Sequence, residues 1–223
     1  MCFDRENDQF YTVSNDRSLK VWNIREMAYM DTHYGHHADI LNLDYYSKDR
    51  IISAGQDNQC IFWKIDEDSE LLYNSAKHAI SSVNVLTNQF FYTTSPENAI
   101  DLWVMNKKKP IYSLEGLHAN DSWILSTAGV RDSDLFCSGS LDGQIVCYGF
   151  DKDKKKFGVQ GRIKNVPGCV NNLKFSHHKA ADLVTNKGSL MLAATHSKEE
   201  RLGRWHVQKG VKTGVSIFRA KQQ

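Results

Sequence analysis

The chain has 223 residues, and its 28 basic and 26 acidic side chains give a formal net charge of +2. This length can bury a substantial core. The near-neutral charge excludes a chain-wide polycationic surface, so any surface that binds nucleic acid must be local. The sequence has no run of 18 apolar residues, and we therefore expect no membrane span and no membrane partner.

The cysteines include no Cys-x-x-Cys pair, and several fall within apolar patterns typical of strands. We interpret them as buried, reduced thiols of an intracellular protein. The five cysteines are Cys2, Cys60, Cys137, Cys147 and Cys169.

Four aromatic residues recur along the chain at intervals of 41, 40 and 45 residues. We call them the marker aromatics: Trp22, Trp63, Trp103 and Tyr148. An acidic residue lies six positions before each one: Asp16, Asp57, Glu97 and Asp142. A serine or threonine lies four positions before each acidic residue: Thr12, Ser53, Thr93 and Ser138. A period of about 40–45 residues is typical of WD-repeat propeller blades.

Taken in chain order, segment 8–24 is expected to supply the last two strands of one blade. Three blades follow at about 36–75, 78–114 and 118–160, and a divergent last blade covers 163–220. The sequence therefore predicts an all-β fold, a WD40-type β-propeller with about four to five blades here of a seven-bladed ring.

The last blade is stretched, because 57 residues separate Tyr148 from Trp205. We expect its extra length at Phe157–Gly161 and at Ser176–Gly188. The final strand is expected at Gly214–Ala220, where apolar residues return after a polar segment.

A histidine lies 25 to 30 residues before each of the last three marker aromatics. WD-repeat blades share this set of histidine, serine or threonine, aspartate and tryptophan, and in that family the four side chains form a buried hydrogen-bond chain. Such a network stabilises a blade only if each member finds a partner. The resemblance implies three structural networks: His36, Ser53, Asp57 and Trp63; His78, Thr93, Glu97 and Trp103; His118, Ser138, Asp142 and Tyr148.

Motifs of catalysis are missing from the sequence. It has no Gly-x-Ser-x-Gly, no His-Glu-x-x-His and no phosphate-binding glycine loop. Adjacent histidines on a strand point to opposite faces and rarely share a metal ion. We therefore expect no enzyme activity, no catalytic residue, no metal, no cofactor and no small-molecule substrate.

Three basic clusters are candidate contacts to RNA or to a protein partner. Lys107–Lys109, and Lys152 together with Lys154–Lys156, lie in predicted turns, where lysines either contact a polyanion or are simply solvated. The third cluster comprises Arg201 and Arg204 with Lys198 and His206. Its arginines flank Gly203 beside Trp205, where they either contact phosphate and bases or pack on Trp205 in a structural role.

The segment 199–210, EERLGRWHVQKG, resembles the closing motif of the U3-specific, 55-kilodalton WD-repeat proteins of the small nucleolar ribonucleoprotein. The strand VNNLKFS at 170–176 and the Lys-Lys-Pro turn at 108–110 resemble the same family. The resemblance covers most of 12–220.

This resemblance implies a non-enzymatic component that binds U3 small nucleolar RNA beside a kink-turn-binding protein and other small nucleolar ribonucleoprotein proteins. It implies a function within a pre-ribosomal complex, in pre-rRNA processing and small-subunit ribosome assembly. It also implies localisation to the nucleus and nucleolus. The alternative is a generic WD-repeat scaffold or substrate adaptor in a protein-only complex.

Overall fold

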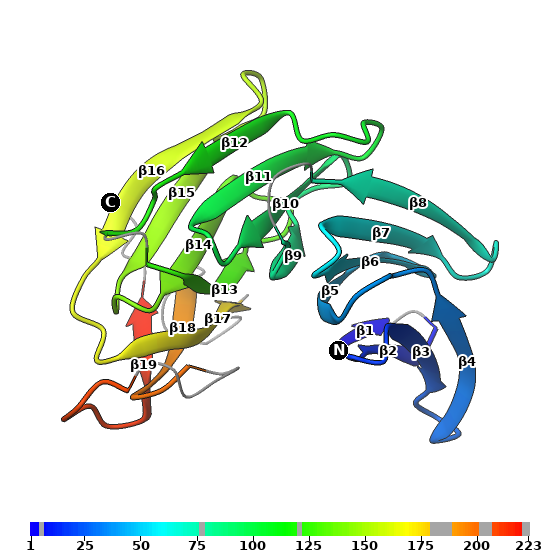
Figure 1. Cartoon of the computed structure of the whole chain (residues 1–223), viewed down its shortest axis with the longest axis horizontal. Helices are drawn as coiled ribbons and strands as arrows, with labels where there is room; N and C mark the ends of the chain where they lie inside the picture. The colour runs from blue at the N-terminus through cyan, green and yellow to red at the C-terminus, as the bar shows by residue number, and fades with distance from the viewer. Residues whose placement is uncertain (5–6, 76–78, 120–121, 179–188, 201–206, 220–223) are drawn as a thin grey trace. The chain divides into compact units, whose positions relative to one another are not determined.

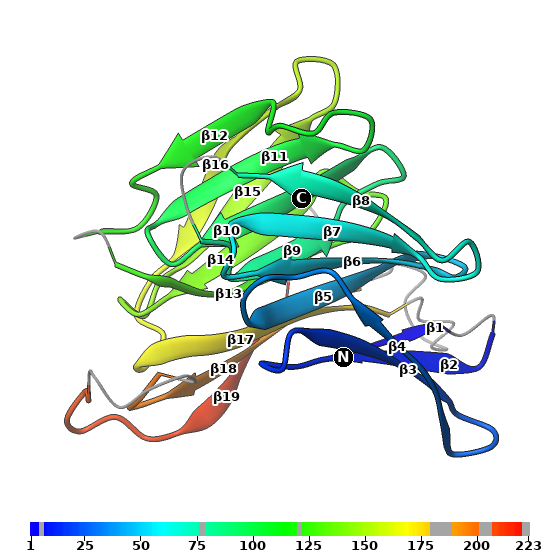
Figure 2. The ribbon, with the colours of Figure 1, turned by 45° about the vertical axis from the view of Figure 1, so that its right-hand side comes forward.

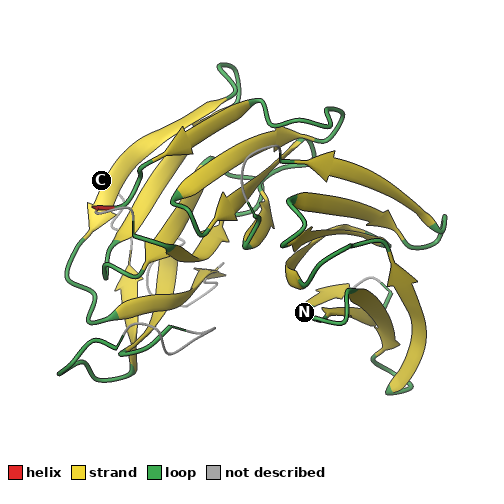
Figure 3. Ribbon diagram, in the orientation of Figure 1, coloured by secondary structure: helices red, strands yellow, loops and turns green. Residues whose placement is uncertain are grey.

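The computed structural model describes residues 1–223 apart from 5–6, 76–78, 120–121, 179–188, 201–206 and 220–223. Its regular elements are antiparallel strands joined by turns (Figure 3), so the all-β prediction is confirmed. The chain divides into two compact units, Met1–Glu115 and Gly116–Gln223. Within the described ranges, no helix is long and apolar enough to cross a membrane.

Among its described residues, the first unit contains three sheets of four strands, each in chain order (Figures 1 and 2). This antiparallel meander is the arrangement of a propeller blade. The sheets are β1 (Cys2–Asp4), β2 (Gln9–Val13), β3 (Ser18–Asn23) and β4 (Ala28–Tyr34); β5 (Ile40–Ser47), β6 (Arg50–Gly55), β7 (Gln59–Lys64) and β8 (Ser69–Asn74); β9 (Ser82–Val85), β10 (Phe90–Ser95), β11 (Ala99–Val104) and β12 (Tyr112–Glu115).

The second unit contains one sheet of four strands and one of three among its described residues. The sheets are β13 (Ile124–Gly129), β14 (Leu135–Ser140), β15 (Ile145–Asp151) and β16 (Lys156–Ile163); β17 (Cys169–His178), β18 (Ser189–Ser197) and β19 (Gly214–Arg219).

Sheets within a unit pack in a repeated way. The first strand of a following sheet contacts the first two strands of the sheet before it: β5 contacts β1 and β2, β9 contacts β5 and β6, and β17 contacts β13 and β14. The middle sheet of the first unit is thus covered on both faces. Ile51 packs against the first sheet and the next residue, Ile52, against the third, because successive strand residues point to opposite faces.

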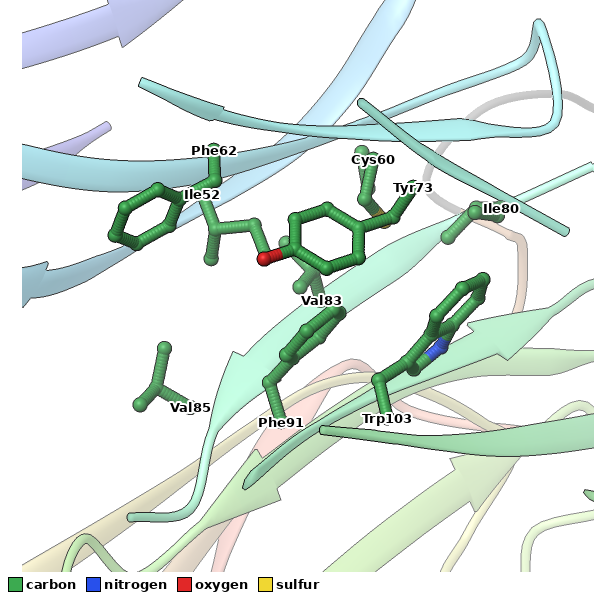
Figure 4. Close-up of a cluster of buried hydrophobic side chains, with 10 residues drawn as sticks. Ile52, Cys60, Phe62, Tyr73, Ile80, Val83, Val85, Phe91 and Trp103 are labelled. Atoms are coloured by element: carbon green, nitrogen blue, oxygen red, sulfur yellow. The ribbon is translucent and has the colours of Figure 1, made fainter. Parts of the chain in front are cut away.

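The core between the second and third sheets is rich in aromatic rings (Figure 4). Tyr73 of β8 sets its ring edge against Phe91 and Trp103, with centroids 5.2 and 6.1 Å apart. Phe91 and Trp103 are stacked at 5.6 Å and are opposite each other in the β10–β11 register. Edge-to-face and offset-stacked rings are the favoured geometries of aromatic pairs.

Two expected segments take a different place in the sheets. Segment 8–24 forms β2 and β3, which are flanked by β1 and β4 in a four-stranded sheet. The expectation of extra length at Phe157–Gly161 was wrong, because these residues lie in β16 and pair with β15. Their glycines suit an edge strand, which carries no continuous apolar face.

Candidate nucleic-acid interface

The four predicted network residues of the second sheet lie in one continuous chain of hydrogen bonds. The Trp63 indole N–H donates to Ser53 Oγ at 2.8 Å, and Ser53 Oγ lies 2.7 Å from His36 Nε2. His36 Nδ1 lies 2.9 Å from Asp57 Oδ2. Ser53 is fully buried and the His36 side chain has no exposed surface.

The chemistry of the two end residues fixes the direction of this chain. An indole N–H only donates and an ionised carboxylate only accepts, so His36 Nδ1–H donates to Asp57. In the neutral imidazole, Nε2 then accepts from the Ser53 hydroxyl. Burial alone would raise the pKa of Asp57, but the hydrogen bonds from His36 and from the His37 backbone N–H outweigh it and hold the pKa below its usual value. The network thereby ties the β4–β5 connection to the β6–β7 turn.

The hydroxyl-to-aromatic bond recurs in the other sheets that carry a marker aromatic. Trp103 donates to Thr93 Oγ1 and Trp22 to Thr12 Oγ1, each at 2.9 Å. In the third sheet, His78 lies outside the described residues, and the Glu97 backbone N–H donates to Ser95 Oγ.

The fourth sheet has a tyrosine variant of the same chain. Ser138 Oγ lies 2.8 Å from both the Tyr148 hydroxyl and His118 Nε2. His118 Nδ1 is 3.5 Å from Asp142, a longer separation than in the second sheet. Burial raises the pKa of the Tyr148 hydroxyl, which keeps this group neutral.

The turn between the second and third strands has one backbone shape in these four sheets. The residue after each acidic marker has a positive φ, which asparagine and glycine tolerate best. These residues are Arg17 (66°), Asn58 (61°), Asn98 (59°) and Gly143 (70°).

The lysines of the first basic cluster lie in the turn between the third and fourth strands of their sheet, which we call an outer turn (Figure 1). Lys107–Lys109 are exposed on the outer turn between β11 and β12. The neighbouring sheet anchors this turn at two points. The Tyr73 hydroxyl donates to the Met105 carbonyl at 2.5 Å, and the Asn74 N–H donates to the Lys108 carbonyl at 3.2 Å.

The second lysine cluster lies in the outer turn between β15 and β16, with Lys156 as the first residue of β16. The Asp151 carboxylate shapes this turn by accepting hydrogen bonds from the Asp153 and Lys154 backbone N–H groups. It also forms an ion pair with Lys154 Nζ at 3.1 Å. The Lys154 backbone hydrogen bond is the main reason why the pKa of Asp151 is lowered. Lys155 takes a positive φ of 52°.

The two lysine turns differ in the charged residues around them, and this difference decides which turn is better suited to contact an anion. Asp132, Asp134 and Asp151 line a shallow hollow together with Lys152 of the second turn, so carboxylates there oppose a polyanion. The turn at Lys107–Lys109 carries three adjacent cations on an anchored backbone. Because local field decides polyanion contact in a near-neutral protein, the first turn is the stronger candidate.

The remaining candidate residues, Arg201, Arg204 and His206, lie outside the described residues. Several exposed aromatics, Trp123 among them, were not singled out from the sequence. Trp123, just before β13, has 48% of its surface exposed, and its carbonyl accepts a hydrogen bond from the Leu141 N–H. Trp123 is a tryptophan that does not fit the spacing of the marker aromatics, and this departure is the sequence feature that could have identified it. The described residues contain no cluster of three or more side chains suited to a metal ion.

The chain is similar to U3 snoRNP-associated and ribosomal RNA-processing proteins. No family model matches the chain. U3 snoRNP-associated protein-like EMB2271 of Arabidopsis thaliana is 26% identical over 97% of this chain and 46% of its own length. Ribosomal RNA-processing protein 9 of Saccharomyces cerevisiae is 22% identical over 96% of this chain and 48% of its own length. The chain thus spans about half the length of the curated relatives it matches.

Solved structures agree with these relatives. A structure of U3-55K matches 96% of this chain and 65% of its own with a TM-score of 0.84 and 28% identity. A crystal structure of RRP9 WD40 repeats matches with the same TM-score, 29% identity, and coverage of 96% and 64%. The prediction of a WD40-type propeller fold is confirmed, and the resemblance to the 55-kilodalton U3-specific proteins extends from the sequence to the structure.

Proposed function

We propose that this chain is a non-enzymatic WD-repeat component of the U3 small nucleolar ribonucleoprotein that acts in pre-rRNA processing and small-subunit ribosome assembly. The likeness to U3-55K over 96% of the chain, at a TM-score of 0.84, carries the proposal. Work in pre-rRNA processing implies residence in the nucleolus.

In this proposal the sheets are a rigid support and the turns make the contacts, as is usual for proteins whose loops carry recognition. Lys107–Lys109 contact phosphates of U3 small nucleolar RNA, and Arg201, Arg204 and His206 remain candidates on their sequence pattern. The anchored backbone of the 105–111 turn supports this role, since a turn held in place loses less freedom when it binds. Other faces bind the kink-turn-binding protein and neighbouring proteins of the particle.

The test is purification of the tagged protein from its own cells, followed by sequencing of the RNA that co-purifies. We expect strong enrichment of U3 small nucleolar RNA that falls as the salt concentration of the wash rises, because phosphate contacts release counterions. Crosslinking by ultraviolet light then reports direct contact. We expect crosslinked peptides from the 105–111 turn.

A different result would favour the alternative function. A defined set of protein partners without RNA enrichment would overturn the proposal and favour a generic WD-repeat scaffold or adaptor. Enrichment of U3 RNA without any crosslink to this chain would retain membership of the particle and reject direct RNA contact.

A further inference from the structure

Two of the five cysteines face each other across neighbouring strands of the fourth sheet. Cys137 of β14 and Cys147 of β15 are directly opposite in the antiparallel register. Their sulfur atoms are 2.9 Å apart, with the Cys137 thiol donating to Cys147 Sγ. Directly opposite residues have Cα atoms about 4.5–5.5 Å apart, which lies within the range of about 4.4–6.8 Å that a disulfide spans.

The remaining cysteines offer no second pair of this kind among the register partners of their strands. Cys60 of β7 is opposite Ala54 on one side and Tyr73 on the other. Cys2 is opposite Tyr11, and Cys169 is opposite Ser197. Cys137 and Cys147 are therefore distinguished by placement, since the backbone already holds their sulfur atoms 2.9 Å apart.

The two thiols also differ in access. Cys137 is fully buried in the core between the fourth and fifth sheets, whereas Cys147 is only partly buried at its margin. On its other side, Cys147 is opposite Gly161 of the edge strand β16, which has no side chain to cover it. Open space surrounds the position that a Gly161 side chain would occupy. A small oxidant can therefore reach Cys147 first.

The contact between the thiols makes the outer one the better nucleophile. Because Cys137 donates its hydrogen bond to Cys147, the pKa of the Cys147 thiol is lowered despite partial burial. The same contact, together with burial, raises the pKa of Cys137. The thiolate is the reactive form of cysteine, so this arrangement assigns the first step to Cys147.

We propose that Cys137 and Cys147 form a reversible dithiol–disulfide site that a peroxide oxidises. The Cys147 thiolate attacks one peroxide oxygen, the O–O bond breaks, and water leaves after protonation, giving a sulfenic acid on Cys147. The Cys137 sulfur then attacks Cys147 Sγ, expels the hydroxyl group as a second water, and closes the S–S bond. Overall, two thiols and one hydrogen peroxide give one disulfide and two waters.

The disulfide links the middle strands of the sheet on the face that packs against β17. Val170 and Leu173 of β17 contact the same core as Cys137. The neighbouring residues Ser138 and Tyr148 point to the opposite face, where they bond to each other. Oxidation therefore fixes the strand pair without breaking the polar chain of that sheet.

One tryptic peptide reports the reaction, because 132–152 contains both cysteines and no internal lysine or arginine. The whole folded chain is treated with hydrogen peroxide, unfolded, alkylated and digested. We expect this peptide to lose two hydrogens and to take no alkyl label, whereas the reduced chain takes two. Dithiothreitol restores both labels. The peptides with Cys2 and Cys60 are internal controls, and Cys60 should keep its label as a buried thiol without a partner.

Two single variants check the order of events. Cys137→Ser should leave a sulfenic acid on Cys147 that dimedone traps, and Cys147→Ser should leave Cys137 reduced in the folded chain. The proposal fails if the wild-type peptide keeps either label, if Cys147 proceeds to sulfinic acid while Cys137 stays labelled, or if the disulfide joins Cys2. The wild-type result stands even if a variant does not fold.

Discussion

At the scale of single residues, one polar contact repeats with different degrees of burial. The Thr93–Trp103 and Thr12–Trp22 bonds have the same atoms, the same length of 2.9 Å and the same separation of ten residues. Thr93 and Trp103 are almost fully buried, at 1% and 0% exposure, whereas Thr12 and Trp22 are half-buried. Water can replace a lost partner only at the half-buried site, so the two bonds should contribute differently to stability.

We expect Thr93→Val to lower the free energy of unfolding by about 1–3 kcal/mol, because it leaves the Trp103 indole N–H buried without a partner. Thr12→Val removes the same hydroxyl and should cost less than about 1 kcal/mol, since water can reach the Trp22 indole N–H. Urea unfolding of both variants against wild type measures the difference. Equal losses would show that burial does not decide the contribution of this bond.

At the scale of elements, the same bonds explain how far the sequence predicts the fold. The hydroxyl and aromatic residues lie on adjacent strands joined by a short turn, so a constant spacing of ten residues reveals β2–β3, β6–β7, β10–β11 and β14–β15. The fourth strands give no such signal. β8, for example, buries only Tyr73 and is defined by its pairing with β7.

The candidate site was predictable to the same limited extent. Sequence identifies Lys107–Lys109 as a basic turn, because a proline and a run of lysines follow a strand pattern. It does not identify the anchors of that turn, since Tyr73 contacts Met105 from 32 residues away in another sheet. Contacts between sheets depend on tertiary packing, which a spacing pattern within one sheet does not encode.

The link between the β4–β5 connection and the β6–β7 turn depends on the charge of Asp57. The pKa of the Asp57 carboxyl is lower in the folded state than in the unfolded state, where it is near 4. The carboxylate therefore contributes fully to stability above about pH 4, and this contribution is lost as the pH falls through the lower pKa of the folded state. We expect Asp57→Asn to lower the free energy of unfolding by about 1–3 kcal/mol at pH 7. The difference from wild type should shrink as the pH falls below about 4.

Denaturant unfolding between pH 7 and pH 3 measures this dependence. Asp153→Asn is the matched control, because it makes the same substitution at an exposed outer turn. It should leave stability unchanged across the range. A stability difference for Asp57→Asn that stays constant down to pH 3 would contradict the assignment to the carboxylate charge.

At the scale of the whole molecule, charge is nearly balanced but unevenly placed. The net charge is only +2, so a general field does not attract nucleic acid. The outer turns differ in sign: Asp66–Asp68 of the second sheet carries three acidic residues, and Lys107–Lys109 of the third carries three basic ones. Two turns at equivalent places in their sheets carry opposite charge, so neutralising each one tests the effect of the sign. Glu67 of the acidic turn also forms ion pairs with Arg50 and Lys64.

We expect the triple variant Lys107→Ala, Lys108→Ala, Lys109→Ala to bind a U3 small nucleolar RNA transcript more weakly at low salt. The slope of log affinity against log salt concentration should become shallower by about 2–3, since each phosphate contact contributes about 0.7–0.9. The control variant Asp66→Asn, Glu67→Gln, Asp68→Asn also neutralises three charges and should keep the wild-type slope. Filter binding across a salt series measures both. An unchanged slope in the lysine variant would reject phosphate contact at this turn. If these lysines contact phosphates, a protein without them must release fewer counterions when it binds, whatever other contacts it makes with the RNA.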